Sequence, residues 1–311
     1  MGWNEDTLHR WLAEQPWPLG LEGSRGHDAA VLRPEAGRPV TCVDQCVEGI
    51  HFDPQVDPAA AGAKAVLRCL SDLAATAAEP RAVTLAVCAP ADWSEDRLRS
   101  VITGAREAAV RHGAELVAGD LAQGPGPAAL TVTAIGALPL EGRPVGRDRA
   151  LPGQQVVVTG PLGGSLPSGR HLRIEPRFEA GRRLWAAGAT AMMDVSDGLA
   201  LDLYRLARAS GVRIELDLAT VPVHDDAVRA AAEGGASGLE RALGDGEDHE
   251  LVATLDSPSA IDGVLPIGRV VEGQGLVLLA RGPDGVMEVQ EWTPGRSGWI
   301  HGGDGPGGKA T

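Results

Sequence analysis

Six aspartates stand in short segments of small and apolar residues, where an unpaired carboxylate would be costly to bury. They are Asp28, Asp44, Asp72, Asp120, Asp194 and Asp197. If the fold brought them together, their charges would repel one another unless cations lay between them. Carboxylate oxygens are the ligands that magnesium prefers, and magnesium held by carboxylates is typical of sites that bind polyphosphates. The acids therefore indicate a magnesium-dependent site for a phosphorylated substrate.

Five of these six acids lie on or next to an element that the residue pattern predicts. Alternating side chains favour strands, and Asp-Pro or Ser before an apolar periodic run favours the start of a helix. Asp44 lies on a strand predicted over 39–47, and Asp72 lies on a helix predicted between Asp57 and Glu79. Asp120 follows a strand predicted over 114–118, and Asp194 ends a strand predicted over 191–194. Asp197 precedes a helix predicted over about 198–210.

The remaining pattern predicts a mixed α/β fold with two domains. Further strands are expected over 82–89, 129–138, 155–159, 212–218, 251–255, 263–271 and 276–279, and a helix capped by Ser94 is expected to end at His112. Strands and helices interleave irregularly, which is typical of a mixed class. The segment 141–153 is rich in Arg, Pro and Gly and reads as a crossover, which predicts domains over 1–146 and 147–311.

Composition excludes several classes of protein. The 311 residues carry 28 basic and 42 acidic side chains, and a formal charge of −14 argues against binding to nucleic acid. No GxxxxGK[ST] motif is present, and no GxGxxG motif follows the first predicted strand, so P-loop and dinucleotide folds are not expected. The sequence predicts neither a membrane span nor a signal peptide. Its four cysteines, Cys42, Cys46, Cys69 and Cys88, form no CxxC pair and predict buried free thiols in a reducing cytoplasm.

Short motifs along almost the whole chain resemble one enzyme family. They are GHDAAV at 26–31, VEGIHF at 47–52, LSDLAA at 70–75, Gly119-Asp120 with Gly124-Pro125, RHLR at 170–173 with Pro176-Arg177, MDVSDGL at 193–199, GEDHEL at 246–251, and the segment from Trp292 to Trp299. Their order is similar to that of the thiamine-monophosphate kinase family, within the aminoimidazole-ribonucleotide-synthetase superfamily.

This resemblance implies a fold and a reaction. An N-terminal α/β domain would bind ATP and metal and pair its sheet with that of a second copy into a dimer barrel, and a C-terminal α/β domain would follow. ATP and thiamine monophosphate would give ADP and thiamine diphosphate by direct transfer, with several Mg²⁺ ions. The resemblance implies magnesium ligands at the six aspartates, with Asp194 and Asp197 catalytic. It implies ATP contacts at Gly119, Asp120, Arg147 and Ser196, and substrate contacts at His51, Glu247 and Trp299.

Departures from the family pattern leave two alternatives open. His27 replaces an acid, Cys42-Val43 replaces a Ser/Thr pair, Cys69 stands where Asn is usual, and Gln123 stands where Arg is usual. One alternative is a diverged member of the superfamily that acts on another substrate. The other is a non-catalytic ATP-binding paralogue that kept the fold.

Some of the same residues also have purely structural interpretations. Arg68 precedes Asp72 by four residues on a predicted helix, a spacing that is typical of an ordinary ion pair. Ser196 and its neighbouring acids are equally typical of a helix N-terminus. Trp299 is a large apolar side chain that could equally pack against the core near the C-terminus.

Overall fold

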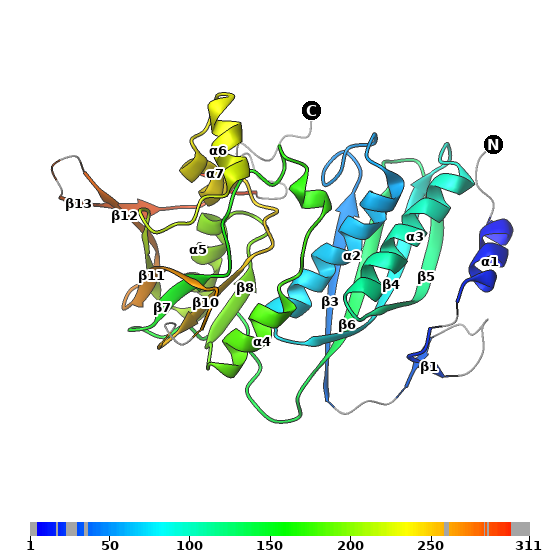
Figure 1. The fold of residues 1–311 in the computed structure, drawn as a ribbon, viewed down its shortest axis with the longest axis horizontal. Coiled ribbons are helices and arrows are strands. Elements are labelled where there is room, and N and C mark those ends of the chain that lie inside the picture. The colour runs from blue at the N-terminus through cyan, green and yellow to red at the C-terminus, as the bar shows by residue number, and fades with distance from the viewer. Residues whose placement is uncertain are drawn as a thin grey trace. The chain divides into compact units, whose positions relative to one another are not determined.

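The computed structural model describes residues 5–16, 18–22, 30–33, 37–257, 261–282, 284 and 286–299. Asp28 and His27 lie outside these described residues. The chain divides into two compact units, one of residues 1–73 and 78–142, the other of residues 74–77 and 143–311. Each unit combines strands and helices (Figure 1). The predicted mixed α/β class is therefore confirmed.

Among the described residues of the first unit, four strands form one sheet in the order β3-β6-β4-β5. The strands are β3 (Arg38–Val47), β4 (Glu79–Pro90), β5 (Glu115–Gly124) and β6 (Ala129–Leu138). Helices α2 (Pro58–Ala75) and α3 (Glu95–Arg111) cover one face of this sheet, as Figure 1 shows. The remaining elements are α1 (Glu5–Glu14) and the short antiparallel pair β1 (Leu21–Glu22) and β2 (Val31–Leu32).

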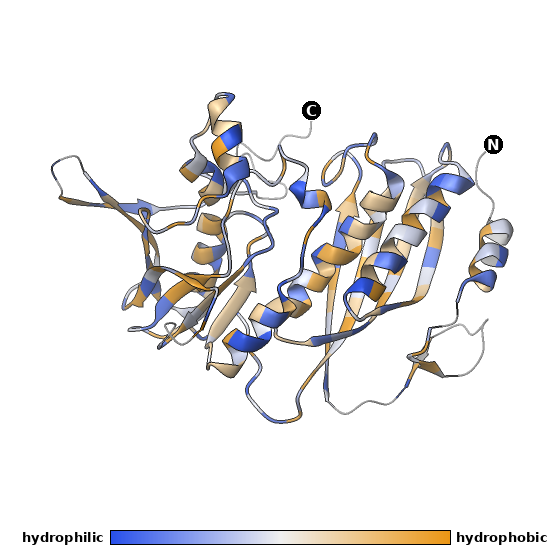
Figure 2. Cartoon of the chain, in the orientation of Figure 1, coloured by the Kyte–Doolittle hydropathy of each residue, from blue (hydrophilic) through white to orange (hydrophobic). Residues whose placement is uncertain are grey.

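Local chemistry accounts for the helix boundaries in this unit. The Ser94 side chain accepts a hydrogen bond from the Arg97 backbone N–H at 3.2 Å, which caps the start of α3. Gly113 adopts a φ of +79° just beyond the helix and ends it. Proline at the first position begins α2. Both helices carry hydrophilic and hydrophobic stripes (Figure 2), and the apolar stripe packs on the sheet.

Two glycines let α2 and α3 approach each other backbone to backbone. A Cβ atom on Gly62 would lie 2.0 Å from the carbonyl oxygen of Val101, and one on Gly104 would lie 2.0 Å from that of Ala59. Neither distance can accommodate a side chain without moving a helix. The spacing of the two helices is therefore set by these two glycines.

Among the described residues of the second unit, seven strands form one sheet in the order β13-β12-β9-β11-β7-β10-β8. The strands are β7 (Gln155–Val158), β8 (Ala191–Asp194), β9 (Arg213–Asp217), β10 (Leu251–Leu255), β11 (Leu265–Val271), β12 (Gly275–Arg281) and β13 (Met287–Trp292). The helices are η1 (Arg170–Leu172), α4 (Phe178–Ala186), α5 (Leu199–Ser210), α6 (Asp225–Ala232) and α7 (Gly238–Gly244).

The core of the second unit joins α5 to its sheet. Leu199, Leu203 and Leu206 on α5 are fully buried in one cluster with Val156 and Val252 of the neighbouring strands β7 and β10. The strand β8 lies at one edge and pairs antiparallel with β10, with Asp194 opposite Leu251. This core places the carboxyl end of β8 directly before α5.

The structure corrects the sequence expectations at several elements. The predicted strand over 114–118 continues to Gly124 as β5, so Asp120 lies within the strand and not beyond its end. The helices α1, α4, α6 and α7 and the strand β13 have no counterpart among the predicted elements. No helix in the described part of the chain is long and apolar enough to span a membrane.

Candidate active site

Two loops of the second unit run side by side and are joined by backbone hydrogen bonds. The N–H of Val195 donates to the carbonyl of Glu250, and the N–H of His249 donates to the carbonyl of Val195, each at 2.8 Å. The N–H of Glu247 donates to the carbonyl of Ser196, also at 2.8 Å. The motifs around Ser196 and Glu247, about fifty residues apart in sequence, therefore form one surface.

Most of the site residues expected in this unit come together there. Asp194 ends β8, Ser196 and Asp197 lie in the following loop, and Glu247 lies in the loop bonded to it. The backbone N–H of Trp299 donates to the Asp197 carbonyl at 2.9 Å, which ties the C-terminal segment to the same place.

Arg147 lies elsewhere in this unit. Its side chain is exposed, and its carbonyl accepts a hydrogen bond from Ser210 at 2.9 Å. The residue before it, Gly146, bridges to Ala191 at the start of β8, whereas Asp194 is at the end of that strand. The described structure thus does not group Arg147 with the loop residues.

His249 is a site residue that the sequence analysis did not identify. Its ring is buried, with Nδ1 3.0 Å from a carboxylate oxygen of Asp194 and Nε2 3.7 Å from one of Glu247. Burial alone would lower the pKa of His249, but the two carboxylates outweigh it and raise the pKa to about 9. The ring is therefore a buried cation between two of the expected site acids at neutral pH. The clue in the sequence was its place inside the GEDHEL motif.

Asp202 holds the loop that carries Ser196 and Asp197. Its buried carboxylate accepts hydrogen bonds from the backbone N–H groups of Ser196 at 3.1 Å and of Asp197 at 3.0 Å. Burial raises the pKa of Asp202 to about 7. Arg205 forms ion pairs with both Asp197 and Asp202. The interpretation of Ser196 as a helix cap is wrong, because α5 begins after Gly198.

Backbone conformation marks the second loop as constrained. Glu247 and His249 have φ values of 57° and 53°, which side chains other than glycine rarely adopt. Gly246 has a φ of +72°, and a Cβ atom there would lie 2.6 Å from the Ser196 carbonyl oxygen. Such conformations persist where the surroundings enforce them, and they are frequent at functional sites. Here the bonds to the neighbouring loop supply that enforcement.

In the first unit, Asp44 and Asp72 lie on facing elements. Asp44 is on β3, and Arg68 of α2 donates to its carboxylate at 2.9 Å. Asp72 is one turn further along α2. Both carboxylates lie close enough to the buried Cys69 thiol to contribute to raising its pKa, although hydrogen bonding to Cys42 and burial contribute more. Arg68 thus forms an ion pair with Asp44 on the neighbouring strand β3, in addition to any interaction along its own helix.

Asp120 lies at the opposite edge of the same sheet. The strand order places β3 and β5 at the two edges, with β6 and β4 between them. Three strand spacings amount to about 14 Å. Magnesium–oxygen bonds are about 2.1 Å long, so Asp44 and Asp120 of one chain cannot share an ion. The structure does not bring these two expected ligands together.

His51 is buried beside the end of β3. Its Nδ1 accepts a hydrogen bond from the Val47 backbone N–H at 3.0 Å, and the fully buried Lys64 donates to its carbonyl oxygen. The ring and backbone of His51 are therefore both held in place by neighbouring groups. A fixed imidazole of this kind can orient a polar ligand group.

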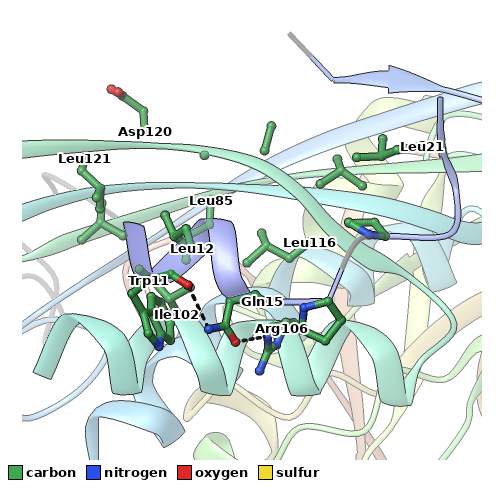
Figure 3. A pocket seen from close by; sticks show the side chains of 16 residues that line it. Trp11, Leu12, Gln15, Leu21, Leu85, Ile102, Arg106, Leu116, Asp120 and Leu121 are labelled. Atoms are coloured by element: carbon green, nitrogen blue, oxygen red, sulfur yellow. Dashed lines mark hydrogen bonds between the residues drawn. The ribbon is translucent and has the colours of Figure 1, made fainter. Parts of the chain in front are cut away.

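A cavity of about 360 Å³ adjoins Gly119 and Asp120 (Figure 3). Trp11 from α1 and Ile102 from α3 supply apolar walls, and Gly119 lies on its β5 side. Asp120 points away from Trp11, toward the other side of the strand (Figure 3). At the polar end, Arg106 donates to Gln15 Oε1 at 2.6 Å, and Gln15 donates to the Trp11 carbonyl at 3.0 Å. An apolar cavity with a polar end suits an aromatic base.

A second cavity, of about 590 Å³, lies in the other unit beside Trp299. Trp292, Leu243 and Arg296 also line it, and Asp245 contributes a carboxylate. It has room for a small heteroaromatic molecule, and it lies next to the segment that is bonded to Asp197.

The carboxylates of each unit are the candidate ligands for magnesium. Among the described residues, no three His, Cys, Asp or Glu side chains converge on a point that would hold a metal ion by themselves. Magnesium is usually bound through one or two carboxylates, several waters and substrate phosphates, without an all-protein cage. Each unit offers carboxylates of the kind that magnesium prefers, Asp44, Asp72 and Asp120 in the first and Asp194 and Asp197 in the second.

Two families of known domains match the chain. The AIR synthase related protein N-terminal domain matches residues 26–138, and the AIR synthase related protein C-terminal domain matches residues 155–281. The thiamine-monophosphate kinase of Rhodopirellula baltica is 36% identical over 270 residues, which cover 81% of this chain and 84% of that protein. The thiamine-monophosphate kinase of Mycobacterium tuberculosis is 37% identical over 294 residues, covering 88% and 84%.

Solved structures are similar over most of the chain. AaThiL complexed with AMPPCP and TMP superimposes with a TM-score of 0.76 at 27% identity, covering 95% of each chain. The thiamine-monophosphate kinase of Stenotrophomonas maltophilia gives 0.74 at 30% identity, covering 89% of this chain and 97% of that one. The hydrogenase maturation protein HypE of E. coli gives 0.73 at 21% identity, covering 93% and 96%, a likeness that concerns the fold alone.

Proposed function

The chain belongs to the AIR synthase related family and, within it, to the thiamine-monophosphate kinases, and we propose on that basis how its residues carry out the reaction. The enzyme transfers the terminal phosphoryl group of ATP to thiamine monophosphate, which gives ADP and thiamine diphosphate. The observation that carries this conclusion is identity of 36–37% to thiamine-monophosphate kinases over more than four fifths of the chain.

The transfer is direct. An oxygen of the substrate phosphate attacks the γ-phosphorus of ATP, a new P–O bond forms, and the bond to the β-phosphate oxygen breaks as ADP leaves. The attacking oxygen is already ionised, so no side chain has to remove a proton from it. The protein's task is to align two anions and to neutralise their repulsion.

We assign magnesium to the carboxylates of Asp28, Asp44, Asp72, Asp120, Asp194 and Asp197. When bound, magnesium would neutralise phosphate charge and hold donor and acceptor in line. Asp202 and Arg205 fix the position of Asp197 through its backbone and its carboxylate. The His249 cation balances the charge of Asp194 and Glu247 beneath the site.

The ATP contacts are proposed at Gly119, Asp120, Arg147 and Ser196. The cavity beside Gly119 supports the placement of the adenine base between Trp11 and Ile102. A stacked aromatic contact in such a cavity stabilises a purine. The base cavity belongs to the proposed N-terminal domain, residues 1–146, whereas the proposed contacts Arg147 and Ser196 belong to the proposed C-terminal domain, residues 147–311.

The thiamine phosphate contacts are proposed at His51, Glu247 and Trp299. Trp299 lines the larger cavity, where its ring can stack on the cationic thiazolium. Glu247 is proposed as a further contact from the neighbouring loop, and His51 offers a fixed imidazole to polar groups of the substrate.

We propose a homodimer formed through the open face of the four-stranded sheet. On that face Val43, Thr133 and Thr84 stand in one row across β3, β6 and β4, and Val43 is 63% exposed. A row of β-branched side chains is suited to packing against a second sheet. Since Asp44 and Asp120 of one chain are about 14 Å apart, they would serve one ion only if they came from different copies.

The first experiment is a direct assay. Purified protein is incubated with ATP, magnesium and thiamine monophosphate, and thiamine diphosphate is followed by chromatography. Magnesium-dependent formation of thiamine diphosphate is expected. Bound ATP without this product would favour a diverged superfamily member with another phosphate acceptor, or a non-catalytic paralogue. We place the reaction in the cytoplasm, a compartment that suits the four free thiols of this chain.

A further inference from the structure

Two cysteines that are 27 residues apart in the sequence meet between β3 and α2. The Sγ atoms of Cys42 and Cys69 are 3.7 Å apart, and Cys42 Sγ lies 3.2 Å from the Cys69 carbonyl oxygen. Cys69 is fully buried, whereas Cys42 is half-buried. Cys42 and Cys69, which lie near Asp44 and Asp72 in the sequence, are thus a contacting pair of thiols.

We propose that Cys42 and Cys69 form a reversible disulfide under peroxide, and that this disulfide switches the kinase off. A disulfide bond is about 2.05 Å long, so the two sulfurs need to approach by roughly 1.7 Å. Such a step is within the reach of side-chain rotation and a small shift of α2 against β3.

The other two cysteines do not compete for this bond. Cys46 lies four residues along the same strand from Cys42, about 13 Å away in an extended backbone. Cys88 lies on β4, where its half-buried side chain adjoins Gly124 of β5. All four cysteines are described residues, and the closest pair of sulfurs among them recorded in the structure is Cys42 with Cys69.

The chemistry balances with hydrogen peroxide as the oxidant. Cys42 is the more accessible thiol, so its sulfur attacks one peroxide oxygen, the O–O bond breaks, and water leaves behind a sulfenic acid. The Cys69 sulfur then attacks Cys42 Sγ, the S–O bond breaks, and the hydroxyl group leaves with the Cys69 proton as a second water. Two thiols and one peroxide give one disulfide and two waters. A dithiol reductant reverses the step.

The consequence for activity follows from the neighbours of the pair and rests on the proposed function. Cys42 stands two residues before Asp44 on the same face of β3, and Cys69 stands three residues before Asp72 on α2. The ion pair from Arg68 to Asp44 crosses the same contact. Magnesium demands near-ideal octahedral geometry. Drawing α2 and β3 together at the cysteines therefore misplaces two proposed ligands.

The test uses the full-length enzyme, first reduced, freed of reductant and then treated with hydrogen peroxide. Peptide mass mapping is expected to show a Cys42–Cys69 link and a loss of two hydrogens. Formation of thiamine diphosphate is expected to fall at least about tenfold, as displaced catalytic groups commonly cause, and to return with dithiothreitol. Failure to form this link, or a link elsewhere, would overturn the proposal.

Matched variants separate this proposal from other causes. Cys42→Ser and Cys69→Ser are each compared with their own untreated activity and are expected to resist peroxide. Cys88→Ser is expected to remain sensitive. If Cys42→Ser loses activity with peroxide as the unmodified enzyme does, the switch is wrong. The mass measurement does not depend on enzymatic activity. If the Cys42–Cys69 link forms in a protein that makes no thiamine diphosphate, the proposed function is contradicted and the disulfide is still supported.

Discussion

Arg68 donates a hydrogen bond from Nε to a carboxylate oxygen of Asp44 at 2.9 Å, across the contact between α2 and β3. The pair is largely buried, with side-chain exposures of 11% and 26%. A fixed cation at this carboxylate competes with any metal ion that binds there. Arg68 therefore stabilises the contact and would lower the affinity of Asp44 for the proposed magnesium ion.

Arg68→Met tests this relationship. The variant leaves Asp44 without its partner, and the free energy of unfolding in urea should fall by about 2 kcal/mol, between the values for exposed and buried pairs. The magnesium concentration for half-maximal activity should fall, since the competing cation is gone. The control is Arg81→Met, which removes the same charge from an exposed pair with Glu79 and should change neither quantity. A raised magnesium requirement in Arg68→Met would contradict the assignment of Asp44.

Asp197→Asn tests the proposed metal ligand of the second unit. Turnover should fall by about two orders of magnitude or more, as the loss of a transition-state charge contact does. The thermal midpoint should move by less than about 5 °C, because Asn keeps the shape of the side chain. Asp262→Asn, at an exposed position, serves as the matched control and should leave both values unchanged. Activity like that of the unmodified enzyme in Asp197→Asn would remove Asp197 from the site.

Trp11→Ala tests the cavity beside Gly119. Loss of the indole wall should raise the KM for ATP about tenfold, the cost of a lost aromatic contact, and leave the KM for thiamine monophosphate unchanged. Trp185→Ala removes the same side chain from the other unit, where its ring nitrogen donates to the Arg143 carbonyl, and should leave both KM values unchanged. Equal changes in the two KM values for Trp11→Ala would mean that the cavity does not hold the base.

Asp248→Asn tests a buried carboxyl group. Burial raises the pKa of Asp248 from 3.8 to about 6, against the opposing effect of Gly163 N–H and Arg170. Between these two values the folded state keeps a proton that the unfolded state has lost, so this group's contribution to stability falls as pH rises through the window. Relative to the Asn variant, the unmodified protein should lose about 2 kcal/mol between pH 4 and pH 6. Urea denaturation of both proteins across that range measures the difference, and parallel curves would refute it.

A subunit-mixing experiment tests the shared site in the proposed dimer. Asp44→Asn and Asp120→Asn should each be inactive alone. After the two are unfolded together and refolded, half of the dimers are mixed, and each mixed dimer has one site with both carboxylates intact. About one quarter of the activity of the unmodified enzyme should return, by this random pairing of subunits. Asp44→Asn mixed with Asp72→Asn is the control and should regain nothing, since those two acids come from one copy.

Much of the fold followed from the sequence because its signals were local. Alternation predicted β3 and β6, and Ser94 and Gly113 fixed the ends of α3. The extent of β5 did not follow, because residues 119–124 lack alternation and are held as a strand by parallel pairing with β4. The helix α7 has a local signal in the sequence, the capping box of Ser237 and Glu240, which marks its start.

Candidate site residues could be named from the sequence, but their arrangement could not be predicted from it. The motif around Ser196 and the motif around Glu247 were both identified, yet only the backbone bonds between them show that they form one surface. The pairing of Arg68 with Asp44 and the contact of Cys42 with Cys69 depend on how α2 is rotated against β3. Sequence periodicity specifies the buried face of a helix but not which residue of a neighbouring strand each side chain meets.

The glycines at 62 and 104 have a consequence for protein engineering. The helix α2 carries the proposed metal ligand Asp72, and α3 carries Ile102 of the proposed base cavity, so the two glycines help to set how far Asp72 lies from that cavity. A variant library that treats them as ordinary helix positions would introduce alanine there as a stabilising change. In this chain that substitution would drive the two helices apart, and selections for altered nucleotide preference would score it as a specificity mutation.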